Sequence, residues 1–149
     1  MNIENYSTHG VFVVVNHQGI LLQGKPGVGK SDLALNLLDK GHTLVVDDLI
    51  LFRQKDDKLI GYGNDHSYGK IHIRNLGVLD LADRYSIVDE YQLDKIIWLS
   101  DEQTIDSALP TLEQANVLGQ NIPLFRLTTG SNRPLAVLVE AITNIKCEI

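Results

Sequence analysis

The chain has 149 residues, 44% of them hydrophobic and 21% charged, and carries a net charge of −6. This length predicts one domain, and the acidic excess argues against a nucleic-acid binder, whose affinity comes largely from cations that neutralise phosphates. No apolar run approaches the roughly 20 residues that cross a bilayer, and the N-terminus lacks a secretory signal. With a single cysteine, Cys147, no internal disulfide can form, so we expect a cytoplasmic protein without membrane contact.

The first part of the chain is predicted to consist mainly of strands, because short apolar, β-branched runs alternate with turn-forming residues. Predicted strands span residues 10–15, 20–23, 43–46, 49–53 and 58–62, and a polar loop spans 63–69. The helical spacing of apolar residues predicts one helix from Ser31 to Lys40, closed by Gly41.

The later part of the chain predicts two strands and two helices. Residues 95–99 are typical of a strand on which Lys95 faces solvent, and residues 111–118 favour a short helix closed by Gly119. Residues 122–127 contain a proline and therefore predict an edge strand, whereas Pro134 begins a helix that extends to Ile145. These elements together indicate a single α/β domain over residues 1–149, with a mixed β-sheet flanked by helices and a flexible start over 1–7.

The segment between the second strand and the first helix matches the phosphate-loop pattern G-x-x-x-x-G-K-[ST] at every constrained position. It reads Gly24-Lys25-Pro26-Gly27-Val28-Gly29-Lys30-Ser31. Glycines let the backbone approach phosphate oxygens, and successive amides converge on the anion at the start of a helix. Lys30 is expected to reach the β- and γ-phosphates, and the Ser31 hydroxyl to ligate Mg²⁺. We therefore predict that the chain binds ATP with Mg²⁺.

The predicted strand over 43–46 ends in two adjacent carboxylates, Asp47 and Asp48. In proteins with this loop, a second strand often delivers an acidic residue to the metal beside the phosphates. Since successive strand residues point to opposite faces, only one of the two is expected to face the phosphates. The alternative is a polar strand end without a catalytic role.

Over roughly residues 8 to 144, the sequence resembles the catalytic domain of bacterial HPr kinase/phosphorylase. The resemblance rests on several segments in the same order as in the family. They are His9-Gly10-Val11, the phosphate loop with Ser31-Asp32, Gly41-His42 leading into Val45-Val46-Asp47-Asp48, Ile73-Arg74-Asn75-Leu76-Gly77-Val78-Leu79-Asp80, Ile122-Pro123, and Asn132-Arg133-Pro134-Leu135-Ala136-Val137 with Glu140 and Asn144.

The resemblance implies a P-loop kinase that transfers the γ-phosphoryl group of ATP to a serine of the phosphocarrier HPr, in regulation of the phosphotransferase system. The same family site also removes the phosphate, using inorganic phosphate and yielding pyrophosphate. By resemblance, Asp47 is the base for the serine proton, oriented by His9. The other implied roles belong to Lys30 on the phosphates, Ser31 and Asp48 at Mg²⁺, and Arg133 on the transferring phosphate. Family members form hexamers, so a homo-oligomer is expected.

Some positions depart from the family pattern. His72 stands where the family has a metal-site glutamate, and imidazole is a poorer ligand than carboxylate for Mg²⁺. Asn75 replaces a glycine, and the glycine-rich basic loop that follows Asp80 in the family is not evident, which predicts a weak phosphorylase activity. Only seven residues precede Thr8, so we expect a short form without the N-terminal domain.

Two alternative functions stay open on the sequence. A small-molecule kinase can share the phosphate loop, although such enzymes usually carry an acceptor-binding domain and an arginine-rich lid. The replacement at His72 also fits a non-catalytic module that senses nucleotide. The sequence itself does not identify the phosphoryl acceptor.

Overall fold

The computed structural model describes residues 2–102, 113–130 and 133–146. Its helices are α1 (Lys30–Asp39) and α2 (Leu135–Thr143), with a short 3₁₀ helix η1 (Asp65–Ser67). Its strands are β1 (Asn2–Ile3), β2 (Ser7–Val15), β3 (Gln18–Gly24), β4 (Thr43–Lys55), β5 (Lys58–Tyr62), β6 (Lys70–Ile73), β7 (Gly77–Asp80), β8 (Ser86–Ile87), β9 (Glu90–Gln92), β10 (Lys95–Ser100), β11 (Glu113–Val117) and β12 (Gln120–Thr128).

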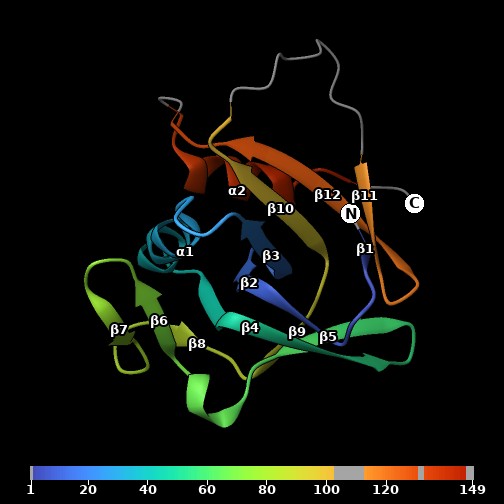
Figure 1. The fold of residues 1–149 in the computed structure, drawn as a ribbon, viewed down its shortest axis with the longest axis horizontal. Coiled ribbons are helices and arrows are strands. Elements are labelled where there is room, and N and C mark those ends of the chain that lie inside the picture. Colours follow the sequence, from blue (N-terminus) through green and yellow to red (C-terminus); the bar gives the residue numbers. More distant parts are fainter. Residues whose placement is uncertain (1, 103–112, 131–132, 147–149) are drawn as a thin grey trace.

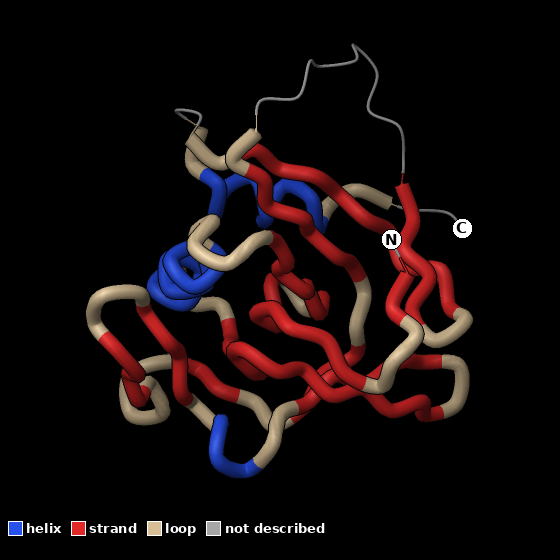
Figure 2. Tube along the Cα trace, viewed as in Figure 1, coloured by secondary structure: helices blue, strands red, loops and turns tan. Residues whose placement is uncertain are grey.

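Within the described ranges, ten strands form one mixed sheet in the order β1-β11-β12-β10-β3-β2-β4-β5-β9, with β8 beside β4 (Figures 1 and 2). β10 runs parallel to both β3 and β12, whereas β2 runs antiparallel to β3 and β4. Strands β6 and β7 form a separate hairpin that lies beside α1. The predicted α/β architecture with a mixed sheet is confirmed.

The sheet has an apolar core on each face. On one face, α1, α2 and the β6–β7 hairpin cover alternate residues of the central strands; we call this the helix-side core, and its members include Val11, Val13, Ile20, Leu22 and Leu44. The intervening residues form a second core on the opposite face, with Phe12, Leu21, Val46, Ile96 and Val117 among its members. Because successive residues of a strand point to opposite faces, each central strand contributes to both cores.

Strand β4 contacts the turn between β11 and β12, although three strands lie between β4 and β12 in the sheet order. The Gln54 amide donates a 3.0 Å hydrogen bond to the Leu118 carbonyl, which joins β4 to the β11–β12 turn. We expected residues 1–7 to form a flexible start, but Asn2–Ile3 pairs in parallel with β11, and Ile3 is buried in the second core. None of the described helices is both long enough and apolar enough to span a bilayer.

The predicted helix over 111–118 is wrong for the residues that the structure describes, since Glu113–Val117 is strand β11; residues 111 and 112 lie outside the described ranges. Ala115 and Val117 are buried while Gln114 and Asn116 are exposed, a period of two that fits a strand. Leu118 and Gly119 both have positive φ, as in a two-residue hairpin turn, and lead into β12.

Strand β12 is also not the edge strand that its proline predicts, because it pairs with β10 on one side and β11 on the other. The ladder with β10 begins at Leu124, one residue after Pro123. The proline therefore lies outside that ladder and removes no donor from it.

Lys95 is buried, which contradicts the prediction that it faces solvent; only 5% of its surface is exposed. Its ammonium donates 3.0 Å hydrogen bonds to the carbonyls of Ile142 and Ile145, and lies 3.4 Å from that of Thr143. These carbonyls belong to the C-terminal end of α2, where backbone acceptors lack helical partners and a cation is favoured. Lys95 thus fastens α2 to the sheet.

We expect Lys95→Met to lower the free energy of unfolding by about 2–3 kcal/mol, because the change leaves buried carbonyls without their charged donor. For a domain of this size the melting temperature should fall by roughly 5–10 °C. Thermal denaturation followed by circular dichroism measures the change, with Lys55→Met on the exposed end of β4 as the matched control. Equal melting temperatures for both variants would contradict this role.

Candidate functional site

The phosphate loop joins β3 to α1 at the carboxyl end of β3, next to the carboxyl end of β10 (Figure 1). Helix α1 begins at Lys30, with Gly29 as its N-cap at a φ of 112°, a conformation that favours glycine. Gly29 has no side chain that could accept hydrogen bonds from the first amides of the helix. These amides, at the positive end of the helix dipole, are therefore available to an anion.

Lys30 folds back over the loop. Its ammonium donates hydrogen bonds of 2.7 Å to the Gly24 carbonyl and 3.2 Å to the Lys25 carbonyl. Burial lowers the pKa of the Lys30 ammonium, and the Asp47 carboxylate opposes this shift. Strand β4 therefore carries the Asp47 carboxylate near enough to the loop to act on the charge of Lys30.

The other loop residues lie at the surface or half-buried. Val28 donates its amide to the Lys25 carbonyl at 3.1 Å, which closes a turn over Pro26 and Gly27. Lys25 forms an exposed ion pair of 3.6 Å with Glu102, which follows β10 in the chain. Ser31, in the first turn of α1, is half-buried.

A β-bulge decides which of the two aspartates faces the loop. Strand β4 pairs with β2 as Leu44 with Val13 and Val46 with Phe12, so Val45 is an extra residue without a partner. In a regular strand, residues two positions apart share a face. Because of the bulge, Leu44 packs in the helix-side core and Val46 in the second core. The bulge turns Asp47 toward the helix-side face.

Asp47 is 9% exposed and is held by the β6–β7 hairpin, since the His72 amide donates a 2.7 Å hydrogen bond to its Oδ2. Burial raises the pKa of the Asp47 carboxyl, the nearby Asp48 charge adds to this effect, and the hydrogen bond from His72 opposes it. A raised pKa suits a group that accepts a proton from an alcohol, because the carboxylate is then a stronger base. We expected the strand to end at the two aspartates, but β4 continues to Lys55.

Asp48 lies on the solvent side at a φ of 84°, a left-handed conformation that aspartate tolerates. Its carboxylate lies 3.5 Å from Nδ1 of His9, and both side chains are about four-fifths exposed. We expected His9 to orient Asp47, but the structure pairs it with Asp48. The reason is the pairing register of β2 with β4. It places Gly10 directly opposite Asp48, so His9, the residue before Gly10, is the neighbour of Asp48 on β2.

Two other predicted residues make no side-chain contact with Asp47 that the structure describes. Arg133 is exposed and precedes α2; residues 131 and 132 before it lie outside the described ranges. His72 reaches Asp47 through its amide, while its side chain is exposed. In the described ranges, no group of three or more histidine, cysteine or acidic side chains is arranged to hold a metal ion.

Sequence reasoning missed one residue of this region, Gln23. Gln23, 7% exposed, donates its amide to the Thr8 hydroxyl and the His9 carbonyl, both at 3.0 Å, and so fixes the strand that carries His9. From the sequence alone, Arg74 could bind phosphate or pair with a structural carboxylate. The Arg74 guanidinium lies against the phosphate loop, since a methyl group built on Gly27 would come within 2.6 Å of its Nη1.

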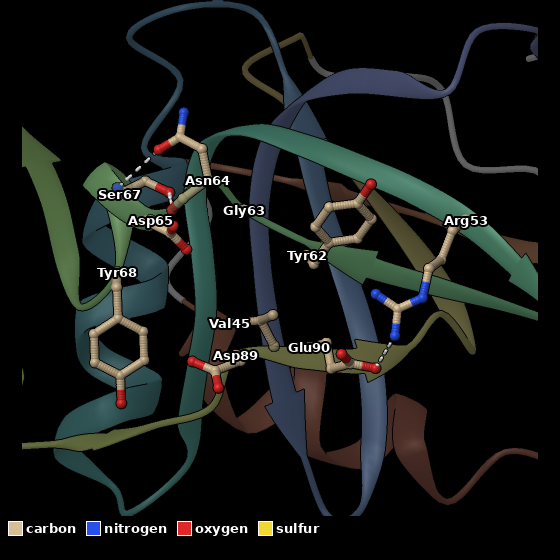
Figure 3. Close-up of a pocket in the computed structure, with 10 residues that line it drawn as sticks. All are labelled: Val45, Arg53, Tyr62, Gly63, Asn64, Asp65, Ser67, Tyr68, Asp89 and Glu90. Atoms are coloured by element: carbon tan, nitrogen blue, oxygen red, sulfur yellow. Dashed lines mark hydrogen bonds and ion pairs between the residues drawn. The ribbon is translucent and has the colours of Figure 1, made fainter.

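A separate polar pocket of about 480 Å³ lies between β5, η1 and β9 (Figure 3). Three carboxylates line it, from Asp65, Asp89 and Glu90, and Glu90 pairs with Arg53 at 2.5 Å. No phosphate-loop residue contributes to its lining, and its acidic excess disfavours an anion. The phosphate loop with Asp47 is therefore the candidate active site.

Comparison with known proteins agrees with this arrangement. The sequence profile of the HPr Serine kinase C-terminal domain matches residues 3–148. The chain belongs to this family. HPr kinase/phosphorylase of Clostridium beijerinckii is 34% identical over 139 residues, which cover 89% of this chain and 46% of that protein. The corresponding protein of Streptococcus sanguinis is 31% identical over 145 residues, 93% of this chain and 47% of that protein.

The solved structure of the Hpr(Ser) kinase/phosphatase from Coxiella burnetii has the same fold. It superposes with a TM-score of 0.85 at 29% identity, covering 93% of this chain and 88% of that one. The chain spans about half the length of the curated relatives that it matches.

Proposed function

We propose that this domain is a serine protein kinase that transfers the γ-phosphoryl group of ATP to an HPr-like phosphocarrier protein. The observation that carries the proposal is the placement of one buried carboxylate, Asp47, against the β6–β7 hairpin, which also reaches the phosphate loop through Arg74. The names of the relatives, HPr kinase/phosphorylase, support the choice of acceptor.

The residues present fit a magnesium nucleotide. The amides at the start of α1 and the Lys30 ammonium would bind the phosphates, and the Ser31 hydroxyl would ligate Mg²⁺ directly. Asp48, which the family resemblance places at the ion, lies instead on the solvent side beside His9. When bound, the ion neutralises charge on the phosphate oxygens. His72 supplies an amide and an exposed imidazole where the family pattern has a glutamate, so this site offers Mg²⁺ one carboxylate fewer.

In the proposed reaction, Asp47 takes the proton from the acceptor serine as the bond between Oγ and the γ-phosphorus forms. The bond between that phosphorus and the β–γ bridging oxygen breaks, and ADP leaves. The hydrogen bond from the His72 amide keeps the Asp47 carboxylate in position throughout. Catalysis of this kind consists mainly of positioning and of charge stabilisation around the transferring group.

The reverse, phosphorolytic reaction is proposed to be weak. After β7 the chain makes a short turn, in which the Leu81 amide donates to the Gly69 carbonyl at 2.7 Å and Leu81 is buried. The amides of Arg84 and Tyr85 both donate to the Leu81 carbonyl at 3.0 Å. This compact turn stands in place of the glycine-rich basic loop that the family resemblance implies.

The deciding experiment incubates the purified chain with Mg·ATP labelled at the γ-phosphate and with HPr, or with HPr whose acceptor serine is replaced by alanine. We expect label on serine of the first protein only. Nucleotide binding without transfer would support a nucleotide-sensing module, and transfer to small molecules alone would support the small-molecule kinase. Adding inorganic phosphate to phosphoserine-HPr measures pyrophosphate release, which should be slower than the forward reaction.

The proposed homo-oligomer, a hexamer as in the family, rests on the resemblance alone. Light scattering of the purified chain measures its mass in solution. A monomer that still phosphorylates HPr would show that the active site is complete within one chain.

A further inference from the structure

Strands β2 and β3 separate just where the phosphate loop begins. The last pair of their ladder on this side is Val11 with Leu22. From there β3 continues beside β10 to Gly24, the first residue of the loop, whereas β2 stays beside β4 and carries His9. The two strands therefore form a fork, with the phosphate loop on one arm and His9 on the other.

The side chain of Gln23 bridges this fork. Its amide donates 3.0 Å hydrogen bonds to the Thr8 hydroxyl and to the His9 carbonyl. In a continued ladder Gln23 would pair with Gly10, so its side chain takes the place of the backbone hydrogen bonds that end where the strands part. Gly10 allows this close approach, because a methyl group there would lie only 2.5 Å from the Leu22 carbonyl oxygen.

Stability alone does not account for a glutamine at this position. Only 7% of Gln23 is exposed, and its Oε1 is buried and accepts no hydrogen bond from the described residues. A buried acceptor without a donor destabilises a fold, whereas an apolar side chain of similar size does not. Thr8 is half-buried and His9 is exposed, so water can replace the amide at both. The glutamine is therefore explained by what its amide holds in place.

The Gln23 amide holds the residue that pairs with Asp48. Nδ1 of His9 lies 3.5 Å from the Asp48 carboxylate, and both side chains are about four-fifths exposed. Asp48 follows the proposed base, Asp47, in the chain, and its charge acts on the Asp47 carboxyl. The position of His9 therefore affects the side of the site that receives the acceptor, while Gly24 begins the side that binds phosphates.

We propose that Gln23 is a positioning residue, which fixes the His9–Asp48 pair relative to the phosphate loop and so sets the geometry between the nucleotide and the acceptor serine. This inference rests on the proposed function and adds to it a residue that precedes the loop. Gln23 acts through the backbone of His9, to which it is hydrogen-bonded.

The kinetic test compares Gln23→Leu with wild type in the serine-labelling assay of HPr. We expect kcat to fall about tenfold, because small displacements in a site that works by positioning slow the reaction strongly. The affinity for the triphosphate analogue AMP-PNP, measured by calorimetry, should change by less than about twofold, since the loop amides and Lys30 are untouched. The melting temperature should equal that of wild type or exceed it.

Gln54→Leu is the matched control, because Gln54 near the end of β4 also donates its amide to a carbonyl of another element, that of Leu118, at 3.0 Å. Its kcat should equal that of wild type. Thr8→Val removes one acceptor of the Gln23 amide and should show part of the loss. The double variant Thr8→Val/Gln23→Leu should be no slower than Gln23→Leu, since both changes remove the same contact.

A second readout does not depend on HPr. The ring signals of His9 in NMR spectra report its surroundings, so Gln23→Leu should shift them. The ring signals of His42, which is held by Glu140, should stay unchanged. If wild type labels no serine of HPr, the proposed function fails, and this comparison still decides whether Gln23 fixes His9.

Four outcomes would overturn the assignment. An unchanged kcat in Gln23→Leu, or unshifted His9 signals, would show that the amide positions nothing. A loss of AMP-PNP affinity as large as the loss of kcat would show that Gln23 acts on the loop alone. A clear fall in the melting temperature of Gln23→Leu would make its role structural.

Discussion

Replacing Asp47 by asparagine is expected to slow phosphoryl transfer strongly and, at the same time, to make the domain more stable. Asparagine cannot take the serine proton, and loss of a general base lowers the rate by about 10²–10⁴-fold. Its side-chain oxygen can still accept the hydrogen bond from the His72 amide, so the local geometry should survive. Serine labelling of HPr measures the first effect, and thermal denaturation the second.

The stability gain follows from the burial of Asp47, which raises the pKa of its carboxyl in the folded state. Between the ordinary pKa and this raised value the folded chain binds more protons than the unfolded chain, so the free energy of unfolding falls as pH rises through that window. Above this window the full cost of the buried charge is present in wild type and missing in Asp47→Asn. Each kcal/mol gained should raise the melting temperature by roughly 2–4 °C.

The pH dependence and a control separate this explanation from a general effect of removing charge. The difference in melting temperature between wild type and Asp47→Asn should shrink as the pH is lowered through the window, because wild type then becomes neutral too. Asp83→Asn, which removes an exposed carboxylate, should show no such gain. A variant at position 47 that is less stable than wild type at neutral pH would refute the argument.

Lys30→Met should prevent productive nucleotide binding with little change in stability. The Lys30 ammonium is a positive charge at the loop, held by the carbonyls of Gly24 and Lys25. Removing a preorganised cation from a phosphoryl-transfer site typically lowers kcat by about 10²–10³-fold. Calorimetric titration with Mg·ATP and the HPr labelling assay measure the two losses.

Lys25→Met is the matched control for Lys30, because Lys25 belongs to the same loop but points into solvent and pairs with Glu102. Exposed pairs contribute little, so its affinity and rate should stay within a few-fold of wild type. Should both variants lose nucleotide equally, the loop would act through its overall positive charge, and the specific role of Lys30 would be wrong.

Sequence patterns predicted the elements whose determinants are local. Spacing and turn residues predicted the helix after the phosphate loop and the strands over 10–15, 20–23 and 58–62, and all are present. The predicted helix near residue 113 failed, because the side chains of Ala115 and Val117 are buried against the second core, which is formed by distant strands. Tertiary packing overrode the local preference there.

The phosphate loop was determined by the sequence itself, since its amides, glycines and lysine are contiguous and constrain one another locally. The choice between Asp47 and Asp48 was not, because it depends on the bulge at Val45, which exists only when β4 pairs with β2. The burial of Lys95 and the approach of Arg74 to Gly27 likewise join residues 47 or more positions apart. Such contacts are set by how the elements pack, and no local pattern in the sequence encodes them.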